Sequence, residues 1–240
     1  MARVHDPRYW QRHFQSQFVP ALNLLVEVLE RRLLPTFRES DINHEAEAVA
    51  DEAWESFMSM PGTGEEDLSN FAELAQEAAL EHYLLVTGIR QGVVNMFAAG
   101  LYHAFEQQLL YFHREELLPY SHQHDAAQLK VSKVKEQLAE RGIGLASFRA
   151  WGLVEELRLL ANAVKHAEGE SAAQLRLARP DLFEEPRLQG LGLDVTPEIS
   201  RPIYLPMIGD DIFVTVDDLM RYRDALIEFW RELGDALCEA

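Results

Sequence analysis

A long stretch without proline, between Pro61 and Pro119, constrains the fold of this chain more than any other feature. From Asp67 or Ser69, either of which can cap a helix, to about Glu116, apolar residues recur at helical spacing. The broad stripe that they form consists of Val93, Phe97, Leu101, Phe105, Leu109 and Phe112. A stripe of large apolar side chains on one face predicts a long helix that packs in the core.

Three glycines interrupt this stretch, namely Gly88, Gly92 and Gly100, and each is a position where the helix could kink or divide. Small residues on a helix face also let a neighbouring backbone approach closely. We therefore expect these glycines to mark tight helix contacts rather than flexible hinges.

Helical patterns also lie on both sides of the long stretch. They cover residues 20–35, 43–59, 126–140 and 148–167, and a last segment that begins at Asp217 or Asp218. Since the chain has no internal repeat and no linker long enough to separate two domains, we expect one domain spanning residues 1–240. The predicted fold class is all-α, an antiparallel helical bundle.

Residues 181–211 differ from the rest, because their prolines and glycines forbid a continuous helix. Residues 203–205, inside this segment, and residues 212–214, just after it, have the composition of short strands. This predicts a small hairpin near Gly209 and Asp210. We expect an irregular insertion or a small β-hairpin here, before the last helix.

The charge of the chain limits its partners. With 22 Lys and Arg against 40 Asp and Glu, the formal net charge is −18. Phosphate binding draws its affinity from clustered cations, so a field this negative repels nucleic acid except at a local basic patch. Any role in binding RNA must therefore be confined to one local site.

Composition also indicates the compartment. The single cysteine, Cys238, cannot form an internal disulfide, and the first 15 residues lack the apolar core of a signal peptide. No run approaches the roughly 18 consecutive apolar residues that a membrane-spanning helix needs. We expect a cytoplasmic protein that does not associate with a membrane.

The predicted helix over residues 148–167 carries the residues with the most chemistry. At 100° per residue, Arg158, Asn162, Lys165, His166 and the nearby glutamate share one arc of about 100°. Asparagine disfavours helix interiors, and the chain has only four lysines, so Asn162 and Lys165 on this face indicate a role for their side chains. Histidine has a pKa suited to proton transfer near neutral pH. The simpler alternative is a solvated face in which Lys165 and His166 complement the helix dipole.

The segment LRLLANAVKHAEGES resembles the signature helix of the HEPN (higher eukaryote and prokaryote nucleotide-binding) superfamily. The stretch from Phe97 to Leu110 is similar to the long core helix of that family. The resemblance implies a compact HEPN-like helical fold and a metal-independent ribonuclease whose arginine and histidine meet across a homodimer interface. It also implies an origin in bacterial toxin–antitoxin or antiphage defence systems, and it carries Asn162 and His166 over as site residues.

The chain departs from the family pattern at one position. Ala161 stands where the family arginine would precede Asn162, and Arg158 lies one residue outside the usual interval before His166. Arg158 or Lys165 is the candidate to stabilise the charge of a phosphorane-like transition state in its place.

The leading hypothesis is therefore an endoribonuclease effector in which His166 transfers the proton and Asn162 orients it or the phosphate. Arg158 and Lys165 would then bind RNA phosphate. The alternative is a catalytically inactive HEPN-like module that binds a protein partner, which the charge of −18 and Ala161 favour. A third hypothesis is a plain helical interaction protein whose acidic surface mimics nucleic acid or binds a basic partner.

We expect neither a metal ion nor a cofactor. His113, His122 and His124 lack the spacing of a zinc or di-iron site, so we expect them to be surface histidines. No phosphate loop, nucleophile elbow or dinucleotide-binding fingerprint occurs in the chain.

Overall fold

A computed structural model describes residues 6–59, 68–186 and 202–239, and over these residues the fold is all-α. The described helices are α1 (Pro7–His13), α2 (Val19–Val28), α3 (Glu39–Ser59), α4 (Leu68–Phe112), α5 (Val131–Glu140), α6 (Trp151–His166), α7 (Glu170–Ala178) and α8 (Val216–Glu239). Short π-helical and 3₁₀ turns extend or connect several of them; the π-helical turn Phe14–Phe18, for example, joins α1 to α2.

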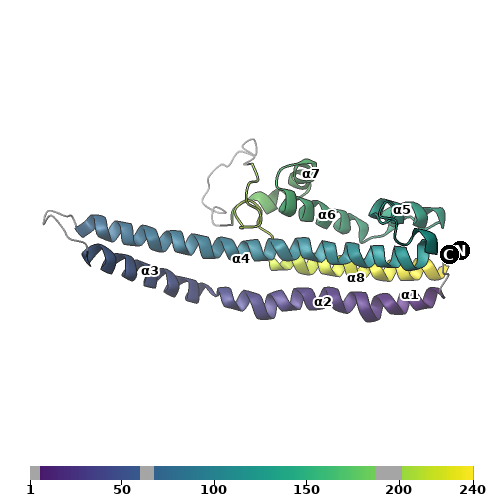
Figure 1. Cartoon of the computed structure of the whole chain (residues 1–240), viewed down its shortest axis with the longest axis horizontal. Helices are drawn as coiled ribbons and strands as arrows, with labels where there is room; N and C mark the ends of the chain where they lie inside the picture. Colours follow the sequence, from purple (N-terminus) through teal and green to yellow (C-terminus); the bar gives the residue numbers. More distant parts are fainter. Residues whose placement is uncertain (1–5, 60–67, 187–201, 240) are drawn as a thin grey trace.

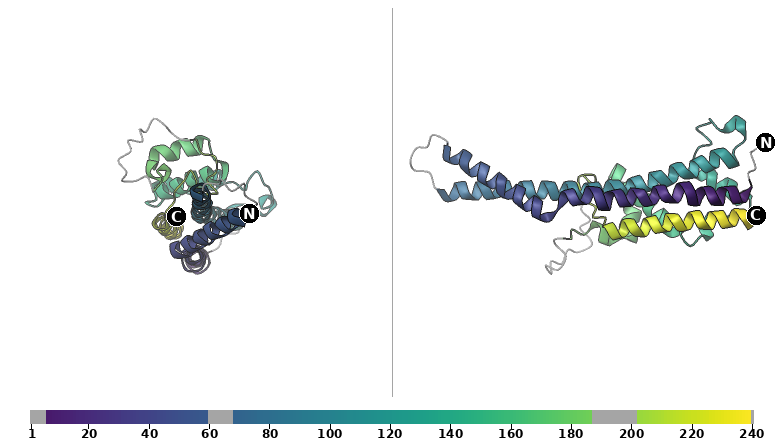
Figure 2. Two further views of the ribbon diagram at one scale, coloured as in Figure 1. Left: turned by 90° about the vertical axis from the view of Figure 1, so that its left-hand side faces the viewer. Right: turned by 90° about the horizontal axis from the view of Figure 1, so that it is seen from below.

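The helices form an elongated antiparallel bundle. Helices α1, α2 and α3 follow one another along one side, and α4 returns antiparallel to them over the whole length (Figure 1). Helix α8 runs beside α1, α2 and α4, while α5 and α6 lie against another face of α4 and α7 packs on α6 (Figure 2). Both ends of the described chain lie at the same end of the bundle, far from the last residues of α3 and the first residues of α4.

Helix α4 is continuous for 45 residues, so the prediction of a long core helix is confirmed. Its glycines do not divide it. Four members of the predicted stripe, namely Leu101, Phe105, Leu109 and Phe112, are buried, and the other two are partly buried against the same core. Helices α2, α6 and α8 pack against α4, while Met96 and Tyr111 of this half stay exposed.

Aromatic side chains from distant parts of the sequence make the centre of the core. Phe14 packs against Trp230 of α8 with ring centroids 4.7 Å apart, and Phe105 of α4 meets Phe229 edge-on at 4.9 Å. Trp10 meets α4 in the same edge-on manner. Such pairs add about 1 kcal/mol each to the gain from burying apolar area, so they fix α1 and α8 on α4.

The predicted hairpin is wrong for the described residues 202–215, which contain no strand. Their backbone groups bind side chains instead of a neighbouring strand. The amide nitrogen of the buried Asn95 donates to the carbonyl oxygens of Pro206 and Ile212 at 2.7 Å each, and its oxygen accepts from the N–H of Val214. A single amide on α4 thus satisfies three backbone groups that a hairpin would have paired. Residues 187–201 of the predicted irregular segment lie outside the described residues.

Two glycines of α4 allow the same segment to approach closely. A Cβ atom at Gly92 would overlap the carbonyl oxygen of Met207, and one at Gly88 would lie 3.0 Å from that of Ile208. A Cβ at Gly100, in contrast, would meet nothing within 4 Å. The predicted tight contacts therefore exist at two of the three glycines, but they are made with an irregular segment and not with a helix.

One helix, Leu68–Leu117, is long and apolar enough to cross a membrane by length and composition alone. A third of its most apolar window is buried within the protein. Core helices of soluble proteins meet the same criterion, and this helix carries the hydrogen-bonded Asn95. The absence of membrane association stays a prediction.

The glycine contacts give a first prediction. Gly92→Ala should destabilise the protein by about 1–3 kcal/mol, because the added methyl group displaces the segment that contains Met207. Gly100→Ala is the matched control on the same helix, and it should stabilise the protein by up to about 1 kcal/mol through helix propensity alone. Urea unfolding of both variants measures the difference, and equal stabilities would contradict the packing described here.

The core also contains a histidine without a good hydrogen bond. His113, just after α4, is fully buried, and neither ring nitrogen makes a well-formed hydrogen bond to the described residues. Burial lowers the pKa of His113, and the nearby side chain of Gln137 offsets only part of this effect. The folded protein therefore holds a neutral imidazole.

A second prediction follows from this histidine. Below about pH 6.5 the unfolded chain binds a proton at His113 that the folded chain accepts only at lower pH, so this residue reduces stability as the pH falls. His113→Leu should therefore lose less stability than the wild type between pH 7.5 and about pH 5.5. Urea unfolding at both pH values measures it, and parallel losses in the two proteins would show that His113 titrates normally.

Candidate functional site

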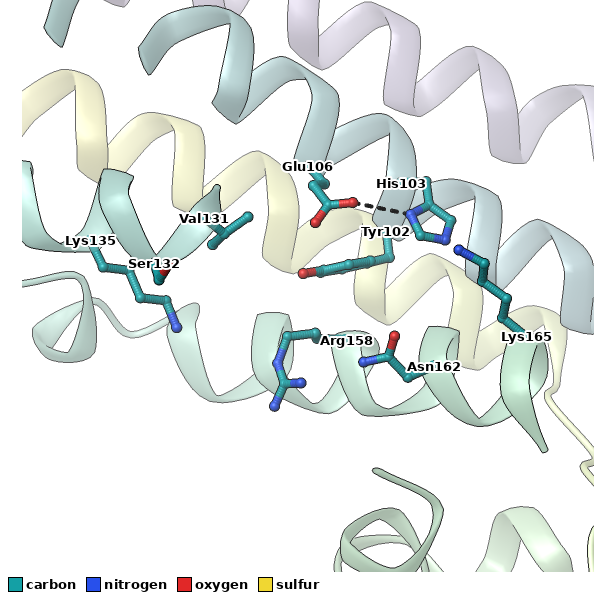
Figure 3. Close-up of a pocket in the computed structure, with 9 residues that line it drawn as sticks. All are labelled: Tyr102, His103, Glu106, Val131, Ser132, Lys135, Arg158, Asn162 and Lys165. Carbon is teal, nitrogen blue, oxygen red and sulfur yellow. Dashed lines mark hydrogen bonds and ion pairs between the residues drawn. The ribbon is translucent and has the colours of Figure 1, made fainter. Parts of the chain in front are cut away.

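A cleft opens where α5 and α6 meet the middle of α4. Its volume is about 430 Å³. The residues that line it are Tyr102, His103 and Glu106 of α4, Val131, Ser132 and Lys135 of α5, and Arg158, Asn162 and Lys165 of α6 (Figure 3). Most of them have polar or charged side chains, so the cleft is suited to a polar ligand.

Helix α6 contributes the residues that its sequence pattern predicted. Arg158, Asn162 and Lys165 lie four and three residues apart, so they share one face, and that face lines the cleft. On the opposite side, Leu157 and Leu160 are fully buried against the core. Burial of the leucines fixes the rotation of α6 and therefore aims the polar face at the cleft.

His166 does not join these residues. It is the last residue of α6, it is exposed, and it is not among the residues that line the cleft. Ala167, directly after it, has a φ of +58° and turns the chain away from the helix. The structure therefore brings Arg158, Asn162 and Lys165 together and leaves His166 outside the cleft.

A different histidine occupies the cleft, and the sequence analysis did not identify it. His103 of α4 lies 3.2 Å from Glu106, measured from Nδ1 to Oε2, and the side chains are 35% and 32% exposed. If Nδ1 carries the proton and donates to Glu106, the lone pair of Nε2 is free to accept a proton. In Figure 3 the ring faces Lys165 across the cleft. The available signal was a His and a Glu three residues apart beside the core stripe of α4.

Tyr102 forms part of the floor. Burial, together with the nearby Glu106, raises the pKa of Tyr102 to about 12, although Arg158 acts in the opposite direction. The phenol is therefore a neutral hydrogen-bond donor at physiological pH.

Two cations of the cleft, Lys135 and Arg158, are held in place by one carboxylate, that of Glu155. Glu155 accepts hydrogen bonds from Nζ of Lys135 and from Nε of Arg158, both at 2.8 Å. Burial opposes the ionisation of Glu155, but the two cations outweigh it and lower the pKa of this carboxyl. Lys135 also lies 4.4 Å above the centre of the Trp151 ring.

The local charge of the cleft is opposite to that of the whole chain. Three cations line it, namely Lys135, Arg158 and Lys165. They outnumber the two nearby carboxylates, which are that of Glu106 in the lining and that of Glu155 beside Lys135 and Arg158. Two of the four lysines of the chain are in this set. In a protein of net charge −18, this cleft is therefore a local site that attracts an anion.

An apolar hollow of about 350 Å³ adjoins the cleft. It is lined by Met96, Ala99, Gly100 and Met207, and it shares His103 and Lys165 with the cleft. A ligand with a charged group and a flat apolar part could therefore occupy both at once.

Among residues 6–59, 68–186 and 202–239, no group of three or more His, Cys, Asp or Glu side chains lies close enough together to hold a metal ion. The prediction of surface histidines is confirmed for His122 and His124, which are exposed, and wrong for His113, which is buried in the core.

No family model matches this chain, and neither a curated protein nor a solved structure is similar to it.

The shared carboxylate gives a third prediction. Glu155→Gln keeps the shape of the side chain but leaves the charges of Lys135 and Arg158 uncompensated, so pyrophosphate should bind roughly three- to tenfold more tightly. Lys165→Gln should weaken the same binding. Isothermal titration calorimetry measures both, with Glu140→Gln on the outer face of α5 as the control for net charge. Equal affinity of the Glu155 and Glu140 variants would contradict the electrostatics described here.

Proposed function

We propose that this protein binds a phosphodiester of RNA in the cleft between α4, α5 and α6 and cleaves it without a metal ion. The observation that carries the proposal is the grouping of Lys135, Arg158 and Lys165 with the His103–Glu106 pair in an otherwise acidic protein. Positive charge at one place and a histidine oriented by a carboxylate are the two requirements of such a reaction.

The chemistry follows from the positions of the side chains. Nε2 of His103 takes the proton of a ribose 2′-hydroxyl, and the 2′-oxygen attacks the neighbouring phosphorus. The bond between phosphorus and the 5′-oxygen breaks, and the 5′-oxygen takes a proton from a water molecule. Solvent has access to the cleft beside Lys165, which is exposed. The products are a 2′,3′-cyclic phosphate and a free 5′-hydroxyl. Arg158 and Lys165 stabilise the charge of the pentacoordinate transition state, and Asn162 donates to a phosphate oxygen.

The adjoining hollow supports a nucleotide in particular. A base next to the bound phosphate would lie in the apolar space between Met96 and Met207, since His103 and Lys165 border both the hollow and the cleft. Simple anions would not use this space.

The HEPN resemblance adds the cellular setting to this proposal, which is that of an effector in a bacterial defence or toxin–antitoxin system. The resemblance by itself implies a homodimer in which His166 of each subunit takes part in the site, and this is the alternative to the assignment made here. Of Asn162 and His166, the two residues that the resemblance carries over, only Asn162 lines the cleft of the single chain. We therefore assign the proton transfer to His103.

A fourth prediction tests this assignment. His103→Ala should reduce cleavage of labelled single-stranded RNA or tRNA in EDTA by about 100-fold or more, because general base catalysis contributes that much. His166→Ala should retain activity within a few-fold. Circular dichroism and thermal unfolding show whether each variant is folded, and light scattering shows the oligomeric state.

The opposite pattern would overturn the assignment. If His166→Ala abolishes cleavage by a dimer and His103→Ala does not, the site lies across a subunit interface, as the resemblance implies.

A second candidate function is a catalytically inactive module that binds a protein partner in a defence or toxin–antitoxin complex. The observation that favours it is Ala161, which is fully buried at the position of the family arginine, so a cation cannot reach the cleft from there. Pyrophosphate binding by a wild type that cleaves no RNA would favour this candidate.

A further inference from the structure

Half of α4 extends beyond the core and pairs with α3 along most of its length, and at Gly88 it also meets residues 208–210. We call α3 together with residues 68–89 of α4 the arm; it projects past the ends of α6, α7 and α8 (Figures 1 and 2). Among the described residues of the arm, only Ile42, Ala46 and Ala75 are buried, and none of the three belongs to the core cluster. The arm therefore has two long faces in contact with solvent.

One of these faces is apolar. Leu74, Leu85 and Ile89 lie eleven and four residues apart, which places them within an arc of about 60° on α4. They are 45%, 63% and 49% exposed. Met96, which is also exposed, continues this stripe toward the apolar hollow. Among the described residues, no element covers the stripe.

Acidic residues border the stripe on both sides. Glu77 and Glu81 flank it on α4. On α3, Oε2 of Glu45 lies 3.6 Å from Nε2 of His82, which precedes Leu85 by three residues on α4. Glu52 follows Glu45 by seven residues and lies on the same face of α3. The described arm holds ten Asp and Glu and no Lys or Arg; the acidic residues are Glu39, Asp41, Glu45, Glu47, Asp51, Glu52, Glu55, Glu73, Glu77 and Glu81.

We propose that the arm is a docking surface for a basic amphipathic helix of a partner protein. Apolar side chains of that helix cover Leu74, Leu85 and Ile89, and its Lys and Arg residues pair with the glutamates on either side. This is the arrangement in which a helix lies along an apolar groove with complementary charges at its edges. The inference goes beyond RNA cleavage and does not depend on whether the cleft is catalytic.

Charge argues against two other occupants. A second copy of the arm would bring two uniformly acidic surfaces together, and like charges across an interface oppose binding. A membrane surface with anionic lipids repels the arm for the same reason, because membrane-binding helices carry Lys and Arg on their polar face.

The test uses a synthetic helical peptide of leucine and lysine, with leucines at spacings of three and four, and fluorescence anisotropy of the full-length protein. Wild type should bind this peptide, and added salt should weaken the binding. Leu85→Ser/Ile89→Ser should weaken it roughly tenfold or more. Glu81→Lys should weaken it as well, because it replaces an attractive charge with a repulsive one.

Matched variants outside the arm make the test specific. Leu177→Ser, at an exposed leucine on α7, and Glu140→Lys, on α5, change the same residue types elsewhere and should leave the affinity unchanged. A peptide with glutamate in place of lysine should not bind. No binding, or equal loss in the control variants, would overturn the proposal.

Two further measurements separate the other occupants. If Leu85→Ser/Ile89→Ser converts a dimer into a monomer in analytical ultracentrifugation, the stripe is a homodimer interface and the proposal is wrong. If wild type floats with neutral or anionic lipid vesicles and this variant does not, the stripe binds a membrane and the proposal is equally wrong. Absence of both effects, together with peptide binding, supports a protein partner.

Discussion

The continuity of α4 is the constraint on which the other parts of the structure depend. One half of this helix supplies the core stripe that α2, α6 and α8 cover, and the other half supplies the arm. The core half also carries the wall of the cleft, with Tyr102 and His103. A helix of this length is stable mainly through the surfaces that it buries. Its two halves therefore differ in how firmly they are supported, since α3 is the main neighbour of the arm.

Polar side chains of α4 hold the irregular segment of residues 202–215 against the helix. Asn95 and Gln91 donate to carbonyl groups of residues 206–214, and they also bind each other. Each buried carbonyl would otherwise cost about 1–3 kcal/mol if left without a partner. Since the same segment carries Met207 into the apolar hollow, these two amides also determine the shape of the space beside the cleft.

Features that repeat along a helix were predictable from the sequence. The stripe of α4 and the polar face of α6 follow from side-chain spacing alone, because burial of one face fixes where the other face points. Arg158, Asn162 and Lys165 were found in this way. A single-helix pattern cannot show which other helix faces the site, so His103 and Glu106 were missed although they lie beside the recognised core stripe.

The irregular segment was harder to predict for a physical reason. Residues 203–205 and 212–214 have β-branched and aromatic composition, which favours strands. The N–H groups of residues 203–205 are instead satisfied by the carboxylates of Glu168 and Asp211. Backbone groups of Ile212 and Val214 bind Asn95, which lies about 120 residues earlier on α4. Propensity describes only local preferences, and here side-chain contacts outweigh them. The same packing explains Gly88 and Gly92, whose neighbour is this segment.

Because α4 has no break, it fixes the distance and the rotation between side chains that lie far apart along it. Leu85 on the arm and His103 in the cleft are 103 − 85 = 18 residues apart on α4, and at a rise of 1.5 Å per residue they are separated by about 27 Å along its axis. Whatever is held at one position is therefore kept at a set spacing and rotation from the other. Inserting a single residue between them would increase their separation along the axis by only about 1.5 Å. It would also rotate one end of the helix by about 100° relative to the other, so the two surfaces would no longer keep their relative orientation.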